Sequence, residues 1–290
     1  MANTEFSYVK SFELPDSLPP SNFIVVRIDG RGFSKLCKKY RFAKPNDRRA
    51  IDLMNSAALE VVKSFQDIIL AYGQSDEYSF VFGEGTQIWE RRSAKLATSV
   101  ASLFTAEYVM QWNDPKFFGG NAEEGKEKVE LTRPFPSFDG RCVCYPKKKI
   151  LRDYLAWRQA DCHINNLYNT TFWSMVLKGE GMSGTAAEEE LKGTLAKDKN
   201  EILWSRYGIN YNNEDAVWRK GTVVYRAYDD EENGADGQGK AQKVTARPQS
   251  KSQLEKERKR KMKARIVVEH TDIIGDDFWN KRPYILGTGE

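Results

Sequence analysis

Cysteine and histidine are scarce in this sequence. Its 290 residues include four cysteines and two histidines, and no CxxC pair occurs. Cys142 and Cys144 stand two apart, which puts both on one face of a strand, and His163 follows Cys162 without a second ligand pair at metal spacing. The sequence therefore predicts reduced thiols, and neither a zinc site nor a disulfide framework.

Long apolar runs are missing as well. No stretch reaches the ~18 apolar residues that a transmembrane helix needs, and residues 1–23 hold no apolar core of signal-peptide length. We therefore expect an intracellular protein without membrane contact, located in the cytoplasm, the nucleus or both.

Charge is nearly balanced over the whole chain but is unevenly distributed along it. The formal net charge is +4, and a hydrophobic content of 40% is ordinary for a globular chain of this length. Residues 251–265, "KSQLEKERKRKMKAR", concentrate lysine and arginine. Such a run favours an acidic partner, above all nucleic acid, but a solvated basic loop explains it equally well.

The first half shows a clear order of strands and helices. The hydrophobic pattern predicts a strand, a helix, a hairpin, a second helix and a final strand, at residues 22–28, 46–65, 67–83 (with its turn at 73–76), about 87–112 and 139–146. This order is typical of the ferredoxin-like βαββαβ arrangement. In that topology the end of the first strand lies beside the tip of the central hairpin, so Asp29 and Asp76 are expected to meet at one edge of the sheet.

The second half is mainly helical. A long helix is predicted at 150–177 and a helix pair at about 185–208, followed by two strands at 221–228 and 265–270. The fold class predicted is therefore α+β, with a palm-like catalytic domain at 1–146 and a mainly helical region at 147–290. We expect the basic insertion at about 229–264 to be disordered and the loop at 113–134 to be mobile.

Two aspartates at adjoining strand ends repel unless a cation lies between them. Magnesium fits Asp29 and Asp76 best, since it takes hard oxygen ligands and leaves positions open for phosphates. Gly30 lets the backbone approach closely, so its carbonyl is a further candidate ligand. Two such ions about 4 Å apart would activate a hydroxyl and stabilise a leaving phosphate oxygen. Each motif alone also fits a plain turn; their convergence is what favours a metal site.

Several cations are placed to bind phosphate near this pair. Lys44 precedes a helix N-terminus, where free N–H groups favour anions. Arg91, Arg92 and Lys95 are predicted in the first turns of the second helix, where a solvated face is an even alternative. Phe42 suits stacking on a base or an ordinary core position.

Amides and aromatic residues alternate in the second half. The segment "WRQADCHINNLYNTTFW" (157–173) suits hydrogen bonding and stacking with unpaired bases, and Arg219 and Lys220 would reach phosphates. The alternatives are a core histidine at position 163 and an Asn-rich turn near residue 212.

These motifs together closely resemble the eukaryotic tRNA(His) guanylyltransferases. The strings that carry the resemblance are "RIDGRGF", "FAKPND", "AYGQSDEYSFVF", "WRQADCHINNLYNTTFW", "KNEIL", "INYNNE" followed by "RKGT", and "DIIGDDFW". The resemblance covers about residues 5–226 and 265–282. The segments 114–132 and 229–264 match no motif of the family.

The resemblance implies a polymerase-type palm that works in reverse, adding guanosine to the 5′ end of histidine tRNA. ATP would adenylylate the 5′-monophosphate, the 3′-hydroxyl of GTP would displace AMP, and pyrophosphate would then be removed. It further implies a homotetramer in which one tRNA bridges subunits.

By motif, the resemblance implies that Asp29, the Gly30 carbonyl and Asp76 hold two Mg²⁺ ions, with Glu77 in support. The nucleotide contacts that it implies are Asp29, Gly30, Arg31, Gly32, Phe33, Ser34, Phe42, Ala43, Lys44, Asp47, Ser75, Asp76, Arg92 and Lys95. The tRNA contacts expected are His163, Asn165, Asn166, Asn169, Arg219 and Lys220. Two other readings stay open from the residues: a nucleotidyl cyclase-like enzyme, and a non-catalytic RNA-binding protein.

Overall fold

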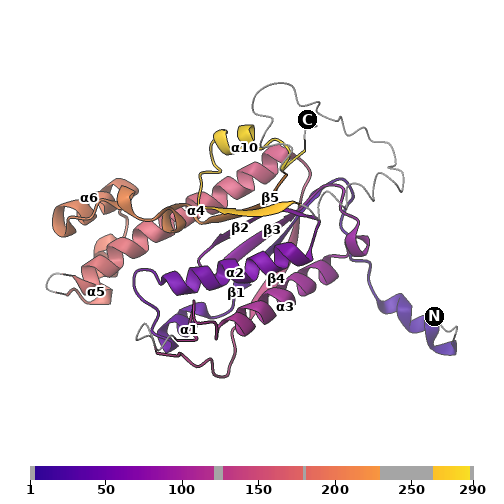
Figure 1. Cartoon of the computed structure of the whole chain (residues 1–290), viewed down its shortest axis with the longest axis horizontal. Helices are drawn as coiled ribbons and strands as arrows, with labels where there is room; N and C mark the ends of the chain where they lie inside the picture. Colours follow the sequence, from indigo (N-terminus) through magenta and orange to yellow (C-terminus); the bar gives the residue numbers. More distant parts are fainter. Residues whose placement is uncertain (1–3, 121–126, 179–180, 229–263, 288–290) are drawn as a thin grey trace.

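Six strands form one antiparallel sheet in the computed structural model, which describes residues 4–120, 127–178, 181–228 and 264–287 (Figure 1). The strands are β1 (Phe23–Gly30), β2 (Ile68–Gln74), β3 (Glu77–Phe82), β4 (Phe138–Tyr145), β5 (Thr222–Ala227) and β6 (Arg265–Glu269). Their order across the sheet is β4-β1-β3-β2-β5-β6, and every neighbouring pair is antiparallel. The expected mixture of helices and an antiparallel sheet is confirmed.

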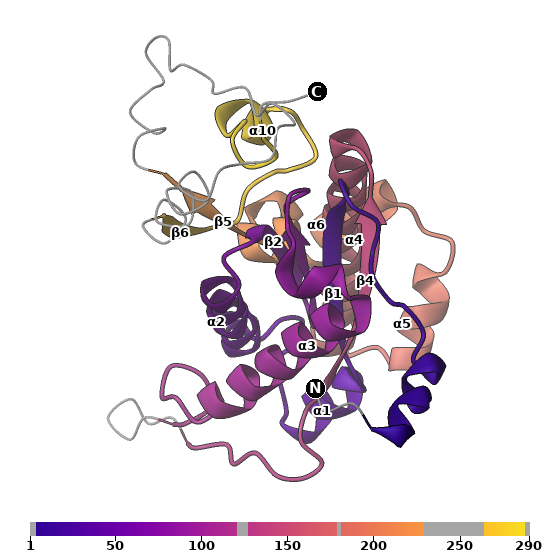
Figure 2. The ribbon, with the colours of Figure 1, turned by 90° about the vertical axis from the view of Figure 1, so that its right-hand side faces the viewer.

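Long helices cover both faces of this sheet. They are α2 (Arg48–Ser64) and α3 (Ser93–Gln111) on one face and α4 (Lys148–Leu177) on the other. Figure 2 shows α2 and α4 on opposite sides of β1. Alternate residues of a strand point to opposite faces, so Val26 and Ile28 pack with α2 and α3 while Val25 packs with Leu151 and Leu155 of α4. Because both faces are covered, Phe23 to Val26 form an unbroken run of buried apolar residues.

Shorter elements complete the chain. They are η1 (Glu5–Phe12), α1 (Phe33–Lys39), η2 (Ile88–Arg91), α5 (Gly184–Leu191), α6 (Ala196–Tyr207), η4 (Tyr211–Asn213), α7 (Ala216–Lys220) and α10 (Asp277–Lys281). The predicted long helix and helix pair are present as α4, α5 and α6. The two late strands do more than form a hairpin, because β5 pairs with β2 and so extends the sheet of the first half.

The central hairpin turns more tightly than the sequence predicted. Gly73 and Gln74 belong to β2 and pair with Tyr78 and Glu77, so the turn consists of Ser75 and Asp76 alone. Ser75 takes a left-handed conformation (φ 49°), which a two-residue hairpin turn requires. Gly73 is needed for packing, because a Cβ there would lie 2.1 Å from the Tyr78 ring.

Part of the loop at 113–134, which the sequence predicted to be mobile, packs against the core. Phe118 is 1% exposed, and its ring stacks on that of Trp112 with centroids 4.1 Å apart. The Trp112 indole donates to the Val129 carbonyl at 2.7 Å. Apolar residues on both sides of 121–126 therefore close the core; 121–126 itself lies outside the described residues.

The structure bears on three further expectations: the disordered insertion, the reduced cysteines and the lack of a transmembrane helix. The insertion at 229–264, predicted to be disordered, lies outside the described residues except for Ala264. All four cysteines are free thiols, as predicted. Among the described helices, none is long and apolar enough to cross a membrane.

The second helix begins at Ser93, not at about Gln87 as predicted. Trp89, Glu90 and Arg91 have positive φ angles, and this irregular turn sends the Arg91 side chain inward. Arg91 is 3% exposed and donates to the carbonyls of residues 18, 19, 22, 84 and 86. It is therefore a structural residue that joins the N-terminal segment to the sheet, and no solvated phosphate ligand.

We predict that Arg91→Met lowers the free energy of unfolding by roughly 3 kcal/mol, because several buried carbonyls lose their donor at once. Guanidinium unfolding followed by circular dichroism measures this. The neighbouring exposed Lys95→Met is the control and should change stability by less than about 0.5 kcal/mol. Equal effects of the two substitutions would contradict the structural role of Arg91.

Candidate active site

The end of β1 meets the tip of the β2–β3 hairpin. Asp29 stands directly opposite Glu77 in the β1–β3 register, and the Gly30 amide donates to the Asp76 carbonyl at 3.0 Å. The Ser75 hydroxyl donates to Asp76 Oδ1 at 3.1 Å. The register thus brings Asp29 and Asp76 to one sheet edge, where the sequence expected them.

Electrostatics at this edge favour a cation. Burial and, with it, the charge of Asp29 raise the pKa of the Asp76 carboxyl above its usual range. Two carboxylates and the Gly30 carbonyl offer the hard oxygen donors that Mg²⁺ prefers. Within the described part of the chain no three acidic, histidine or cysteine side chains form a metal cluster, so a metal here would depend on backbone oxygen and substrate as well.

Glu77 lies beside this pair but is held by two arginines. Arg158 Nη1 donates to both carboxylate oxygens at 3.3 and 3.2 Å, and Arg27 Nε lies 3.6 Å from Oε2. Burial raises the pKa of Glu77, while the charges of Arg158 and Arg27 oppose the rise. The sequence predicted Arg158 only as part of the base-binding segment 157–173, and not as a partner of Glu77. Its 81-residue separation from Glu77 left no local signal, and only the docking of α4 on the sheet brings the two together.

The loop after β1 divides its residues between the core and the solvent. Arg31, Gly32 and Ser34 are exposed, whereas the Phe33 ring is buried 5.0 Å from that of Phe138. Gly30 must be glycine, because a Cβ there would lie 2.3 Å from the Phe33 ring. Phe33 therefore anchors the loop and leaves only its backbone free for a ligand.

The segment 42–47 shows the same division. Phe42 is 7% exposed and stacks on Phe118 with centroids 5.1 Å apart, so it occupies a core position. Asp47 caps α2, accepting from the Ala43 amide at 3.0 Å and from Arg49. Burial acts to raise the pKa of Asp47, but these hydrogen bonds hold it below its usual range. Ala43 and Lys44 remain exposed for a ligand.

Cys37 lies beside the predicted nucleotide-binding segment, a position that no sequence pattern indicated. It lies half-buried on α1, and its carbonyl accepts from the Phe42 amide at 2.9 Å. Burial raises the pKa of its thiol; the nearby charge of Lys44 opposes the rise, and that of Asp76 adds to it. Cys37 therefore stands among the predicted nucleotide-binding residues.

The structure does not bring Arg92 and Lys95 to the carboxylates within one chain. Both stand at the N-terminal end of α3, where the Ser93 carbonyl accepts from the Cys142 thiol in the middle of β4. The other end of α3 packs near the site, since Tyr108 contacts Phe33. Binding of the nucleotide by Arg92 and Lys95 stays a prediction, which their position in a single chain does not support.

The predicted tRNA contacts on α4 face in two directions. His163, Asn165 and Asn169 are exposed. Asn166 is buried and bonds to Asn46 and to the Tyr211 hydroxyl, both at 3.0 Å. Asn166 thus joins the 42–47 segment to the helical region instead of facing a partner.

The two predicted tRNA contacts on α7 differ: Arg219 is bonded within the chain through its side chain, and Lys220 only through its backbone carbonyl. Arg219 Nε donates to the Glu214 carbonyl at 2.7 Å. The Lys220 carbonyl accepts from Tyr72 and Gln159, which leaves its ammonium group as the part available to a phosphate.

Comparison with known proteins identifies the family of this chain. Residues 6–146 match the family model described as "tRNAHis guanylyltransferase", and residues 149–275 match that of the "Thg1 C terminal domain". The tRNA(His) guanylyltransferase of Neurospora crassa is 53% identical over 99% of this chain and 96% of its own length. That of Schizosaccharomyces pombe is 48% identical over 98% of each chain. The chain belongs to the tRNA(His) guanylyltransferase family.

Solved structures of the family share the fold. The crystal structure of the Saccharomyces cerevisiae tRNA(His) guanylyltransferase is 46% identical and covers 76% of this chain and 93% of its own, with a TM-score of 0.69. A bacterial guanylyltransferase-like protein in complex with ATP is 20% identical, with a TM-score of 0.64 over 97% of this chain and 96% of its own. The second likeness extends to the fold alone.

The raised pKa of Asp76 predicts the effect of removing its charge. At a pH above the folded-state pKa of Asp76, its ionised carboxylate lowers the stability of the fold. The folded chain binds the proton more readily than the unfolded chain does, so this stability is regained as the pH falls through that pKa. We therefore predict that Asp76→Asn raises the Tm by about 2–4 °C in EDTA at neutral pH, with a smaller gain at mildly acidic pH.

Differential scanning fluorimetry with and without Mg²⁺ tests both the charge and the metal. Mg²⁺ should raise the Tm of the parent and not that of Asp76→Asn. The exposed Asp277→Asn is the control and should keep the parent's Mg²⁺ response. An Asp76→Asn variant that is less stable, or that responds to Mg²⁺ like the parent, would refute the carboxylate–cation site.

Cys37 supplies a chemical probe of the nucleotide site. We predict that iodoacetamide alkylates Cys37 slowly and that GTP with Mg²⁺, at ten times its Kd, slows the reaction by about tenfold, because bound nucleotide covers the thiol. Peptide mass spectrometry measures each cysteine separately. Half-buried Cys144, at the other end of the sheet, is the internal control and should react at one rate throughout. If Cys37 is alkylated at the same rate with and without GTP, while calorimetry verifies that GTP binds, the nucleotide does not bind beside Cys37.

Proposed function

We propose that this chain is a tRNA(His) guanylyltransferase, an enzyme that adds guanosine to the 5′ end of histidine tRNA. The single observation that carries the proposal is the pairing of Asp29 with the Asp76–Glu77 hairpin tip. It occurs in a chain 53% identical over nearly its full length to an enzyme of that name.

The catalytic fold proposed is a ferredoxin-like palm made by β1–β4 with α2 and α3, at residues 1–146. Its support is the order β4-β1-β3-β2, with both aspartates at the same sheet edge. Residues 147–290 would form the tRNA-recognition region, in line with the change from one family model to the next between 146 and 149.

Two Mg²⁺ ions are proposed to bind Asp29, the Gly30 carbonyl and Asp76. When bound, they would lower the pKa of the attacking hydroxyl and stabilise the leaving phosphate oxygen. The chain's own part is positional: the β1–β3 register fixes the two aspartates, and Arg158 and Arg27 hold Glu77 behind them.

The nucleotide would lie over the 31–34 loop and the 42–47 segment. Exposed Ser34 and Lys44 are available to its phosphates and Ala43 to its base, while Phe42 and Asp47 shape the pocket from within. Structures of related proteins in complex with ATP and with GTP have the same fold, which is consistent with this placement.

The reaction proposed has three steps. A 5′-phosphate oxygen of the tRNA attacks the α-phosphorus of ATP, and pyrophosphate leaves. The 3′-hydroxyl of GTP then attacks the activated 5′-phosphorus, forming the new phosphodiester bond and releasing AMP, while the hydroxyl proton passes to solvent. Water finally cleaves the triphosphate of the added guanosine, leaving a 5′-monophosphate and free pyrophosphate.

Recognition of the tRNA is proposed for the exposed side of α4, at His163, Asn165 and Asn169. These side chains lie beyond Arg158 on the same helix, so the RNA would pass the carboxylates as it contacts them. A homotetramer is part of the proposal, with one tRNA bridging two subunits.

Incorporation of labelled GTP into 5′-monophosphorylated histidine tRNA, with ATP and Mg²⁺, tests this function. We expect labelled tRNA from the parent and at least a ~10³-fold lower rate from Asp76→Ala, because the metal ligands act directly in the chemical step. Asp277→Ala should match the parent. Binding of tRNA without incorporation would favour a non-catalytic RNA-binding protein, and cyclic nucleotide formed from GTP without RNA would favour a cyclase.

A further inference from the structure

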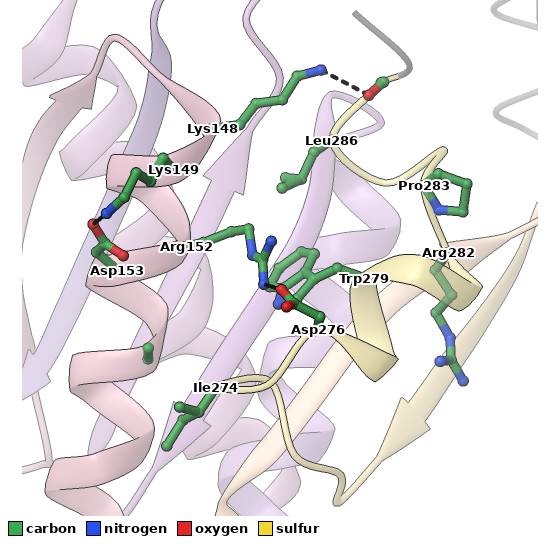
Figure 3. A pocket seen from close by; sticks show the side chains of 12 residues that line it. Lys148, Lys149, Arg152, Asp153, Ile274, Asp276, Trp279, Arg282, Pro283 and Leu286 are labelled. Carbon is green, nitrogen blue, oxygen red and sulfur yellow. Dashed lines mark hydrogen bonds and ion pairs between the residues drawn. The ribbon is translucent and has the colours of Figure 1, made fainter. Parts of the chain in front are cut away.

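A cavity of about 450 Å³ lies between the start of α4 and the C-terminal segment that packs against it (Figure 3). The residues that matter in its wall are Lys148, Lys149, Arg152, Asp276, Trp279 and Arg282. Figure 3 shows Arg152 reaching from α4 to Asp276 and Trp279 of the other wall, so the cavity is built by two segments far apart in the sequence. The proposed reaction uses none of these residues.

The cations of the cavity differ in how they are neutralised. Lys149 pairs with Asp153 at 2.7 Å and Arg152 with Asp276 at 2.5 Å. Among the described residues, Lys148 Nζ donates only to the Gly287 carbonyl, at 2.8 Å. Among the residues that the structure describes, no carboxylate lies within 4.0 Å of Lys147 or Lys148. Within the described part of the chain, the rim therefore carries a positive charge at Lys148 that no carboxylate neutralises, and exposed Lys147 precedes it in the sequence.

The position of these lysines is unfavourable for the helix itself. Lys147 is the N-cap of α4 and provides no side-chain cap, and its first turn holds no acidic residue. Cations at a helix N-terminus are repelled by the aligned peptide dipoles, where acidic or hydroxyl residues would be stabilising. By contrast, α2 and α5 have Asp47 and Ser183 as capping residues. A ligand anion would offset the repulsion at α4.

The cavity lies at the opposite end of the sheet from the carboxylates. Tyr145, just before α4, pairs with Phe23 at the start of β1, whereas Asp29 is near its end. At ~3.3 Å per residue the two sites stand roughly 20–25 Å apart. A mononucleotide at the carboxylates cannot reach the cavity, but an RNA whose 5′ end is there carries phosphates over that distance.

The cavity is also unsuited to reading a base. The Trp279 side chain is buried, and the Arg152 guanidinium lies over its ring at 5.4 Å, so its face is not open for stacking. Arg282 is occupied by Glu269 and the Tyr225 hydroxyl. Lys149 is paired with Asp153, but Lys147 and Lys148 have no carboxylate partner among the described residues, so their ammonium groups suit phosphate oxygens.

We propose that Lys147, Lys148 and Lys149 bind a backbone phosphate of the RNA substrate while its 5′ end lies at the carboxylates, an inference that rests on the proposed function. Lys147 and Lys148 fall between the two ranges matched by the family models, and Asp276 to Arg282 fall beyond them. This contact is independent of sequence in the RNA and anchors the substrate far from the reacting atoms.

The test replaces all three lysines by glutamine in the full chain. Filter binding with 5′-monophosphorylated histidine tRNA should give a Kd about tenfold higher, and the slope of log K against log salt should fall in magnitude by about one, since one phosphate contact is lost. The KM for tRNA should rise in parallel, with kcat and the KM values of ATP and GTP unchanged. The Tm should stay equal or rise, because the repulsion at α4 is relieved.

Two matched variants accompany this triple glutamine variant. Lys10, Lys63 and Lys128 are exposed lysines elsewhere, and replacing them by glutamine removes the same charge; tRNA binding should stay close to that of the parent. Replacing Lys147 to Lys149 by arginine keeps the charge and should retain the parent's Kd.

Three results would overturn the inference: a Kd and salt slope like the parent's, an equal loss in the control triple variant, or weaker ATP or GTP binding, which would indicate a nucleotide site. If the parent binds tRNA through these lysines but incorporates no GTP, the proposed function fails while the RNA contact stands. If the glutamine variant has a lowered Tm, its weaker tRNA binding could come from partial unfolding, and the arginine variant becomes the test. Loss of tRNA binding in the arginine variant, which keeps the positive charge, would reject the phosphate contact.

Discussion

The burial of the Asp76 carboxylate beside Asp29 is the constraint on which the site depends. Folding half-buries Asp76 at the sheet edge where Asp29 also lies, so loss of hydration, to which the charge of Asp29 adds, makes ionised Asp76 destabilise the metal-free chain. The fold tolerates this because the pair sits on backbone that is well determined: β1 is covered on both faces, and the Gly30 amide ties its end to the hairpin tip. The electrostatic cost is thereby confined to a place where a cation would relieve it.

Glu77 shows how the surroundings keep that charge in position. It faces the same side of the sheet as Asp29, and without Arg27 and Arg158 a third carboxylate would add to the repulsion. Through its ion pairs with Arg27 of β1 and Arg158 of α4, Glu77 joins the hairpin to both of these elements. Removal of Arg158 would therefore affect the turn that holds Asp76, although Arg158 itself belongs to the other half of the sequence.

The sequence predicted most of the fold and the centre of the site, because both follow from local patterns. The period of the apolar residues indicated β1 to β4, α2, α3 and α4, and the expected topology brought Asp29 to Asp76. What failed were features set by tertiary contacts. The start of α3 was misplaced because Arg91 enters the interior to meet five carbonyls. Arg158, predicted only within the base-binding segment 157–173, meets Glu77 because α4 packs on the sheet.

One helix, α4, unites the parts of the molecule that the sequence keeps separate. Its 30 residues span roughly 45 Å, with the lysine-rich cavity at the start, Arg158 against Glu77 in the middle, and His163 to Asn169 further along. Under the proposed function, the fixed spacing of these three groups on one helix would match distances along a bound RNA. Contact at either end of α4 would be coupled to the carboxylates through the Arg158–Glu77 contact, and a substrate contacting both ends would have its reactive end at the sheet edge.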